Sequence, residues 1–217
     1  GDDVFGDTTV KNFESQGINT SLISRVAGAS GVAPIWVEPN GTNRIICVPG
    51  ANNEMTPEQA QSAVEGLAEI KVVIGQLEIP QEVTIAAFSA AQKRGITTIL
   101  NPAPFAPLDE RLIRVSDWII PNETEFAGMH PRGLRPDSDS IIKELSDQLG
   151  CRFAVTLGEN GAAYCDNSGK ISRVRAPKVN AIDTTGAGDA FVGAFAFGLA
   201  SGLSDQMAAE LGCICAS

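Results

Sequence analysis

Residues 71–100 read KVVIGQLEIPQEVTIAAFSAAQKRGITTIL, and this stretch decides the fold class. Two apolar, β-branched runs at 71–75 and 96–100 flank an amphipathic segment, 80–94, that is long enough for a helix. A strand, a helix and a second strand in this order form the unit from which parallel sheets are built. Because both runs are almost continuously hydrophobic, we expect strands that are covered on both faces. The stretch therefore predicts an α/β fold with a mainly parallel sheet.

The same alternation continues toward the C-terminus. In chain order, the further predicted elements are a helix at 107–115, a strand at 117–120, a helix at 137–149 that opens on the capping residues Asp137-Ser138, a strand at 152–156 and a β-hairpin around the turn at 166–169. A chain of 217 residues is long enough to bury one large core, so we expect one main domain over residues 1–217.

The segment before residue 57 has a different pattern. Two strand-like runs, 32–37 and 44–48, flank Asn40-Gly41, a strong signal for a hairpin turn. We therefore expect a small β-hairpin over about residues 30–49, in which Trp36 takes part in packing.

Composition narrows the set of partners. The formal net charge is −10, so the long-range field repels nucleic acid and anionic membranes, and phosphate would have to be bound locally. The most apolar segment, 190–200, is shorter than the roughly 20 residues of a membrane span and is predicted to be a buried helix. The five cysteines lack metal-ligand spacing and are expected to be reduced core thiols. We expect a cytoplasmic protein, although an organelle-targeting segment could precede Gly1.

Polar clusters follow four of the predicted strands. They are 76–78 (Gln-Leu-Glu), 101–104 (Asn-Pro-Ala-Pro), 121–125 (Pro-Asn-Glu-Thr-Glu) and 156–161 (Thr-Leu-Gly-Glu-Asn-Gly). Ligands of open parallel sheets bind beyond the carboxyl ends of the strands. The clusters therefore predict a binding site at that edge, whereas His130 is expected in a surface loop and Trp118 in the core.

The strongest local motif is Asp183-Thr-Thr-Gly-Ala-Gly-Asp189, which is followed by a predicted helix. Two glycines at a helix start let backbone N–H groups converge where the helix dipole favours an anion. The motif is neither a Walker A loop nor a Gly-x-Gly-x-x-Gly dinucleotide fingerprint, because no Gly-Lys follows and Gly193 is misplaced. On the local pattern alone, the glycines serve equally well in a tight turn that caps the helix.

Asp189 has two readings. A carboxylate beside bound phosphate is explained if it acts as a general base, since phosphoryl transfer needs a group that accepts the proton of the attacking hydroxyl. Asp189 could instead cap its own helix.

Three motifs in this order, the 183–189 loop, Asn122-Glu-Thr-Glu125 and Thr156-Leu-Gly158, resemble those of the PfkB carbohydrate kinases, also called the ribokinase family. Within that family, the ribokinase members are matched by Ser30-Gly-Val-Ala33, Gly50-Ala-Asn52, Gln76-Leu-Glu78 and Asn101-Pro-Ala-Pro104. The resemblance covers essentially the whole chain. It implies a three-layer α/β/α sandwich with a mainly parallel central sheet, in which the hairpin at 30–49 is a lid over the sugar and mediates a homodimer.

The resemblance also implies roles for the sugar and phosphate residues. Asp189 would be the base that acts on the 5-hydroxyl of the sugar, Glu78 would contact the sugar, and the anion hole would be formed by Gly186, Ala187 and Gly188.

The co-substrate implied by the resemblance is ATP. Its site would be lined by Asn122, Thr156, Leu157, Gly158, Glu159, Asn160, Gly161, Gly188 and Asp189. Glu125 would organise Mg²⁺ through water, and Asp183 and Thr185 would bind K⁺; oxygen ligands of this kind suit both ions.

The resemblance further implies that the domain is incomplete at both ends. An Asn-x-Asp sugar motif and a Gly-Gly-Lys-Gly-Ala-Asn segment would lie before Gly1, and a segment that completes the adenine pocket and the potassium site would follow Ser217.

The leading functional expectation is transfer of the γ-phosphate of ATP to the 5-hydroxyl of D-ribose, a step in the use of ribose as a nutrient. Two alternatives remain: a related kinase for fructose, deoxyribose or a nucleoside, and a homologue that binds nucleotide or sugar without catalysis. A dinucleotide-dependent oxidoreductase shares the α/β pattern, but the fingerprint for it is missing.

Overall fold

The structure, a computed structural model, describes residues 1–37, 43–180 and 184–217. At its centre is a six-stranded sheet in which neighbouring strands follow one another along the chain. The strands are β3 (Val72–Gly75), β4 (Thr97–Leu100), β5 (Trp118–Ile119), β6 (Arg152–Thr156), β7 (Ala162–Cys165) and β8 (Ile171–Val174). β3 to β6 pair in parallel, and β7 and β8 continue the sheet as an antiparallel hairpin. The predicted α/β class is confirmed, with a mixed sheet that is parallel over its first four strands.

The strand–helix–strand unit predicted from residues 71–100 is present. Between β3 and β4, α3 (Gln81–Lys93) buries Val83 and Phe88. The two strands pair in register from Val72–Thr97 to Gly75–Leu100. Both strands therefore end at the same edge of the sheet, which places the segments that follow them side by side.

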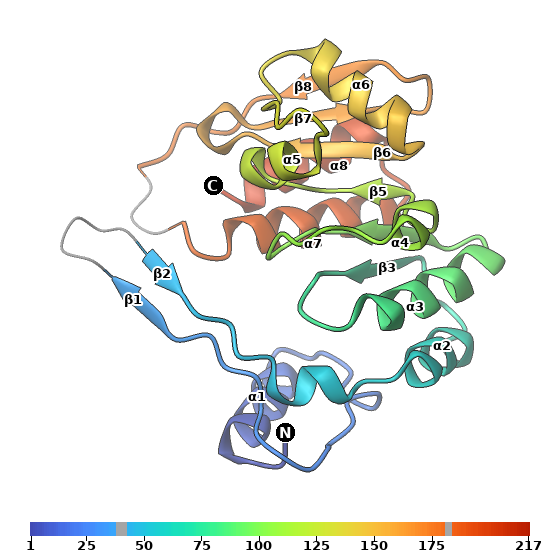
Figure 1. Cartoon of the computed structure of the whole chain (residues 1–217), viewed down its shortest axis with the longest axis vertical. Coiled ribbons are helices and arrows are strands. Elements are labelled where there is room, and N and C mark those ends of the chain that lie inside the picture. Colours follow the sequence, from blue (N-terminus) through green and yellow to red (C-terminus); the bar gives the residue numbers. More distant parts are fainter. Residues whose placement is uncertain (38–42, 181–183) are drawn as a thin grey trace.

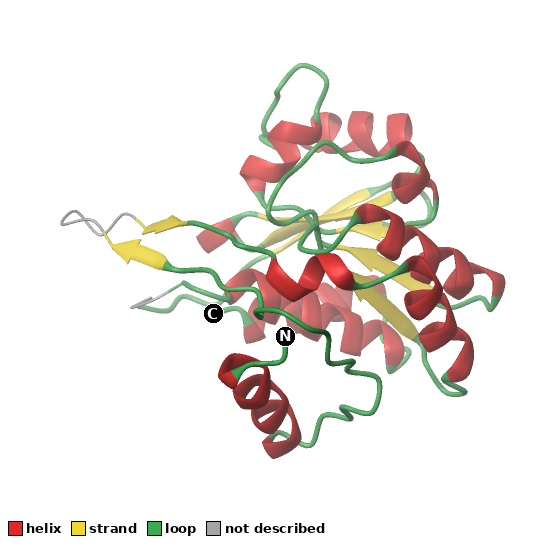
Figure 2. Cartoon of the chain, turned by 60° about the horizontal axis from the view of Figure 1, so that its bottom comes forward, coloured by secondary structure: helices red, strands yellow, loops and turns green. Residues whose placement is uncertain are grey.

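Helices cover both faces of the sheet, as Figures 1 and 2 show. One face is covered by α7 (Ala187–Ala200) and α8 (Asp205–Cys215), and the other by α3, α4 (Glu110–Arg114), α5 (Glu123–Met129) and α6 (Asp139–Leu149). Neighbouring strand residues enter opposite cores: Trp118 packs with α7 and α8, and Ile119 with the helices of the other face. This confirms the expected three-layer sandwich. α2 (Pro57–Gly66) packs on the outer side of α3.

The N-terminal part lies beside the sandwich. It contains α1 (Val4–Ser15), the strands β1 (Ile35–Val37) and β2 (Asn43–Ile45), and the 3-10 helix η1 (Gly50–Glu54). The predicted hairpin is confirmed by the antiparallel pairing of β1 and β2, and it projects from the body of the molecule (Figures 1 and 2). The predicted turn at Asn40-Gly41 lies outside the described residues.

Three detailed expectations were wrong. His130 is buried, with 3% of its surface exposed, because the segment after α5 folds back so that the Arg132 N–H donates to its Nδ1 at 3.2 Å. Ser138 occupies the N-cap position of α6, as predicted, but its side chain makes no capping hydrogen bond; its hydroxyl lies 2.9 Å from that of Ser140. Only three of the five cysteines are buried: Cys47 and Cys215 are exposed.

Within the described residues, no helix is both long enough and apolar enough to cross a membrane.

Candidate active site

The carboxyl ends of β3 to β6 are tied together by hydrogen bonds. The N–H of Asn101 donates to the carbonyl of Gly75 at 2.9 Å, and the side-chain amide of Asn101 donates to the carbonyl of Ile120 at 2.8 Å. The N–H of Thr156 donates to the carbonyl of Pro121 at 3.0 Å. The four polar clusters at the strand ends therefore meet along one edge. Asn101 is buried, and its backbone and side-chain N–H groups bond the ends of β3 and β5 to the end of β4.

Asn122 and Glu125 form a reciprocal cap at the start of α5. The side-chain Oδ1 of Asn122 accepts from the N–H groups of Thr124 at 2.9 Å and Glu125 at 2.8 Å. In return, Oε2 of Glu125 accepts from the N–H of Asn122 at 2.8 Å. This capping box fixes both side chains where the β5–α5 turn opens onto the edge.

Glu125 is a buried carboxylate, with 8% of its surface exposed. Burial raises the pKa of its carboxyl group because loss of water disfavours the charged form, and the hydrogen bond from the Asn122 N–H offsets part of that effect. A carboxylate that is fixed and partly desolvated in this way can orient the water ligands of a cation.

The segment 156–161 forms the turn between β6 and β7. The short 3-10 helix η2 (Gly158–Asn160) is closed by a hydrogen bond of 2.8 Å from the N–H of Leu157 to the carbonyl of Gly161. Glu159 and Asn160 are exposed, as is Gly158, whereas the side chain of Leu157 is buried in the core beside α6. Leu157 can therefore face a ligand through its backbone only.

The start of α7 presents open backbone donors. Gly186, the N-cap, has φ of +78°, a left-handed conformation that disfavours every residue with a side chain. The N–H of Ala187 donates to the carbonyl of Thr184 at 3.2 Å. Among the described residues, no acceptor is found for the N–H groups of Gly188 and Asp189. These two groups point out of the helix N-terminus, where an anion is favoured.

Asp189 lies in the first turn of α7 and its side chain is exposed. Within the described residues, the Asp189 carboxylate has no hydrogen-bonding side-chain partner. An unengaged carboxylate directly beside open N–H donors is a poor cap for its own helix and is free to accept a proton from a ligand.

Glu78 lies in the loop between β3 and α3, and its side chain is exposed. Its backbone carbonyl accepts a hydrogen bond of 3.2 Å from the side-chain amide of Asn52 in η1. The neighbouring N–H of Leu77 donates to the carbonyl of Ala103 at 3.0 Å, which anchors this loop to the segment after β4.

These parts lie on the same side of the molecule. Figure 1 shows that the N-terminal end of α7, the loop after β3 and the β1–β2 hairpin are on the side toward which the parallel strands point. The structure thus places the loop after β3, the turns after β5 and β6, and the start of α7 on the same side of the sheet.

Two points separate the structure from the sequence-based expectation. Asp183, predicted to bind K⁺, lies outside the described residues, whereas Thr185 is described and exposed. The contact between Asn52 and Glu78 was not predicted, because it joins segments 26 residues apart and no spacing rule links them. The only available signal was the Gly50-Ala-Asn52 motif, which marked the segment and gave no partner.

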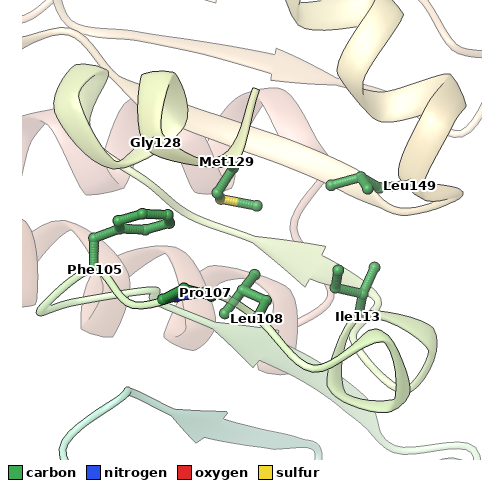
Figure 3. A pocket seen from close by; sticks show the side chains of 7 residues that line it. All are labelled: Phe105, Pro107, Leu108, Ile113, Gly128, Met129 and Leu149. Carbon is green, nitrogen blue, oxygen red and sulfur yellow. The ribbon is translucent and has the colours of Figure 1, made fainter. Parts of the chain in front are cut away.

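A pocket on the helical layer is a different feature from this edge. Seven residues, none of them charged, line it: Phe105, Pro107, Leu108, Ile113, Gly128, Met129 and Leu149 (Figure 3). None of the predicted site residues is among them, so this pocket is not a candidate for ATP or sugar.

Comparison with known proteins gives consistent matches. The profile of the family described as "pfkB family carbohydrate kinase" matches residues 1–217. A deoxyribokinase of Salmonella typhi is 40% identical over 201 residues, which is 90% of this chain and 65% of that protein. A ribokinase of Lactococcus lactis is 35% identical over 204 residues, 94% of this chain and 65% of that protein.

Solved structures agree with these matches. The structure of Arabidopsis thaliana ribokinase complexed with ribose and ATP covers 100% of this chain and 72% of its own, with a TM-score of 0.86 and 26% identity. The chain spans 65% of the length of the two curated relatives.

Proposed function

The chain belongs to the pfkB family of carbohydrate kinases, and from that premise we propose that it carries the phosphate-transfer machinery of an ATP-dependent sugar kinase. In the proposed reaction, the γ-phosphate of ATP is transferred to the 5-hydroxyl of D-ribose. The observation that carries the proposal is the start of α7, where the N–H groups of Gly188 and Asp189 and the Asp189 carboxylate have no hydrogen-bond partner among the described residues. Anion binding and proton acceptance are two of the functions that phosphoryl transfer requires of a protein.

The proposed chemistry follows from that arrangement. The Asp189 carboxylate accepts the proton of the sugar hydroxyl while the hydroxyl oxygen bonds to the γ-phosphorus, and the bond from that phosphorus to the bridging oxygen of ADP breaks. The backbone at Gly186, Ala187 and Gly188 stabilises the developing charge. Since the Ala187 N–H is occupied by Thr184 in this structure, Gly188 and Asp189 supply the donors that are already open.

The nucleotide is proposed to lie along the turns after β5 and β6. Asn122 is fixed by its capping box, and the exposed residues 158–160 sit at the neighbouring turn, which places polar groups of two adjacent strand ends on one surface. Mg²⁺ would neutralise the phosphate charge, and the buried Glu125 would hold it through water. Asp183 and Thr185 are proposed to bind K⁺.

Two acceptors are favoured by specific observations. Ribokinases and deoxyribokinases are both among the similar proteins, at 35% and 40% identity respectively, so ribose and deoxyribose are the first acceptors to compare. A preference for fructose or adenosine in an assay with ATP, Mg²⁺ and K⁺ would overturn the proposed acceptor class.

The β1–β2 hairpin is proposed to act as a lid over the sugar and as the contact of a homodimer. Ile35, Trp36 and Ile46 are exposed large apolar side chains on or beside it, which a second copy would bury. Sedimentation of the protein as a monomer at micromolar concentration would exclude this dimer. We place the activity in the cytoplasm, where the buried free thiols of Cys151, Cys165 and Cys213 would stay reduced.

The decisive test is replacement of the proposed base. Asp189→Asn keeps the size and the backbone of the residue but cannot accept the proton, so we expect kcat to fall by about 10²- to 10⁴-fold. Nucleotide binding, measured by titration calorimetry, should remain within a fewfold of the wild type. Undiminished turnover would refute the base. A wild-type protein that binds ATP and ribose without turnover would instead support the non-catalytic alternative.

A further inference from the structure

In the described part of the chain, one side-chain amide joins the N-terminal part, residues 1–55, to the loop after β3. Among the described residues, the bond from Nδ2 of Asn52 to the carbonyl of Glu78, 3.2 Å long, is the only hydrogen bond or ion pair between residues 1–55 and 57–217. The N-terminal part carries the β1–β2 hairpin, and the partner loop carries Glu78. The contact therefore joins the proposed lid to the proposed sugar-contacting loop.

Asn52 is held rigidly on its own side. Gly50, at the start of η1, has φ of +51°, and a Cβ there would meet the carbonyl oxygen of Ala29 at 2.6 Å, so the two segments are in direct backbone contact. The N–H of Ala51 donates to the same carbonyl at 2.9 Å. The N–H of Asn52 donates to Pro49 at 3.0 Å. The 3-10 helix that carries Asn52 is thus bonded to the segment at Ala29, which leads into the hairpin.

Hydrogen bonds also hold the base of the hairpin together. Val32 and Val48 exchange two backbone hydrogen bonds, of 3.0 and 2.9 Å, between the two chain segments that enter and leave the hairpin. Ser30 donates to the carboxylate of Asp3 through its N–H and its hydroxyl, each at 2.7 Å. Bonds from the N–H groups of Gly6 and Ser30 hold the pKa of Asp3 at about 2, so this clamp stays ionised at neutral pH.

On the side of the β3–α3 loop, the bond from Asn52 leaves the carboxylate of Glu78 available to a ligand. Asn52 binds the backbone carbonyl, and none of the polar contacts within the described residues engages the Glu78 carboxylate. The loop is braced next to this point by the bond from Leu77 to Ala103. Leu77 is bonded to the segment after β4, and Glu78 is bonded to Asn52 near the base of the hairpin. The direction of the Glu78 side chain therefore depends on both bonds.

We infer that Asn52 is a positioning residue for the acceptor sugar: it ties the segment at the base of the β1–β2 hairpin to the β3–α3 loop and so fixes the placement of Glu78. The inference rests on the proposed roles of Glu78 and the hairpin in sugar binding. A hydrogen bond of this kind shifts an equilibrium by about three- to tenfold. Its loss should weaken sugar binding and leave ATP binding, which is proposed at the turns after β5 and β6, unchanged.

The test compares Asn52→Ala and Asn52→Asp with Asn53→Ala in the full-length protein. Asp keeps the size of Asn but presents an acceptor to the Glu78 carbonyl, and Asn53 is an exposed neighbour in the same 3-10 helix. We expect both Asn52 variants to raise KM for ribose by about three- to tenfold, with kcat and KM for ATP within twofold of the wild type. Asn53→Ala should match the wild type.

Hydrogen exchange at amides 77–79 gives a readout that needs no turnover. Both Asn52 variants should exchange faster there than the wild type, and Asn53→Ala should not. The inference would be overturned if Asn52→Asp kept the KM for ribose and the exchange rates of the wild type. It would also be overturned if Asn53→Ala changed both quantities as much as the Asn52 variants do. A wild type that turns over no sugar would refute the proposed function, whereas the exchange result would still decide whether Asn52 holds the loop.

Discussion

Two carboxylates at the site occupy opposite environments. Asp189 is exposed at a helix start and contacts no other polar side chain among residues 1–37, 43–180 and 184–217, whereas Glu125 is buried and bonded to the Asn122 N–H. A group that takes a proton from a ligand must be accessible, and a group that orders the water around a cation must be fixed. The difference in environment therefore separates the two proposed roles, although both side chains carry the same chemical group.

Replacement of Glu125 by Gln should affect the stability of the fold and the activity in opposite directions. Because the folded-state pKa of Glu125 is raised, the folded protein binds its proton more tightly than the unfolded chain, so stability is lost as the pH rises through that pKa. Gln carries no charge and can still accept from the Asn122 N–H. We expect Glu125→Gln to have a Tm at pH 7.5 equal to or above that of the wild type, with the difference shrinking as the pH falls toward about 4.3.

The activity of Glu125→Gln should fall, although its stability is expected to stay the same or rise. Loss of the charge should raise the Mg²⁺ concentration needed for half-maximal rate, or lower the rate, by about 10- to 100-fold. Glu123→Gln is the matched control, because Glu123 lies in the same helical turn, is more exposed and pairs with Arg135 at 3.3 Å. A lower Tm at neutral pH with an unchanged Mg²⁺ requirement would contradict the prediction.

At the scale of elements, α7 combines a core helix with a binding end. Phe191, Val192 and Phe195 bury one side of it against the sheet and α8, and these contacts fix the direction in which its N-terminus points. Packing of this kind supplies most of the stability of a protein helix. The helix can therefore tolerate two glycines, Gly186 and Gly188, in its opening turn.

The glycines of α7 allow a matched pair of substitutions. A Cβ at Gly188 or at Gly193 would meet nothing within 4 Å, so Ala at either position should raise stability by up to about 1 kcal/mol through helix propensity. Cβ atoms tilt toward the helix N-terminus, so only the methyl group at 188 would enter the space in front of the open N–H donors. We expect Gly188→Ala to impair ATP turnover by tenfold or more, and Gly193→Ala to leave it intact. Equal turnover in the two variants would argue against phosphate at this end.

At the scale of the whole molecule, one layer of side chains joins sheet and helices. Trp118 of β5 meets Phe195 of α7 edge to face at 4.9 Å between ring centroids. Arg152 of β6 stacks over the same indole at 4.0 Å and pairs with Asp205 of α8 at 3.2 Å. The position of α7, and with it the proposed catalytic end, depends on this layer.

Truncation within this layer should destabilise the whole fold. Phe195 is fully buried, so Phe195→Ala is expected to cost about 3–5 kcal/mol in the free energy of unfolding, measured by urea denaturation of the 217-residue chain. Phe197, on the same helix, is 66% exposed, and Phe197→Ala should change stability by no more than about 0.5 kcal/mol. Similar losses in both variants would show that the two sides of α7 are equally covered.

The sequence alone determined the class of the fold and most of the candidate site. Strand and helix positions follow from local hydrophobic periodicity, and a parallel sheet brings the carboxyl ends of its strands to one edge whatever the side chains are. Residues at 78, 122–125, 156–161 and 186–189 could therefore be proposed from their places along the chain. The hairpin around residues 30–49 was predicted for the same local reason.

Contacts between distant segments were decided only by the tertiary structure. The burial of His130 depends on a segment that folds back over α5, and the bond between Asn52 and Glu78 depends on where the hairpin base lies against the β3–α3 loop. Which backbone donors of α7 remain open depends on local turn geometry that motifs do not encode, as the bond from Ala187 to Thr184 illustrates. Local patterns fix elements, but partners far apart in sequence are selected by packing of the whole chain.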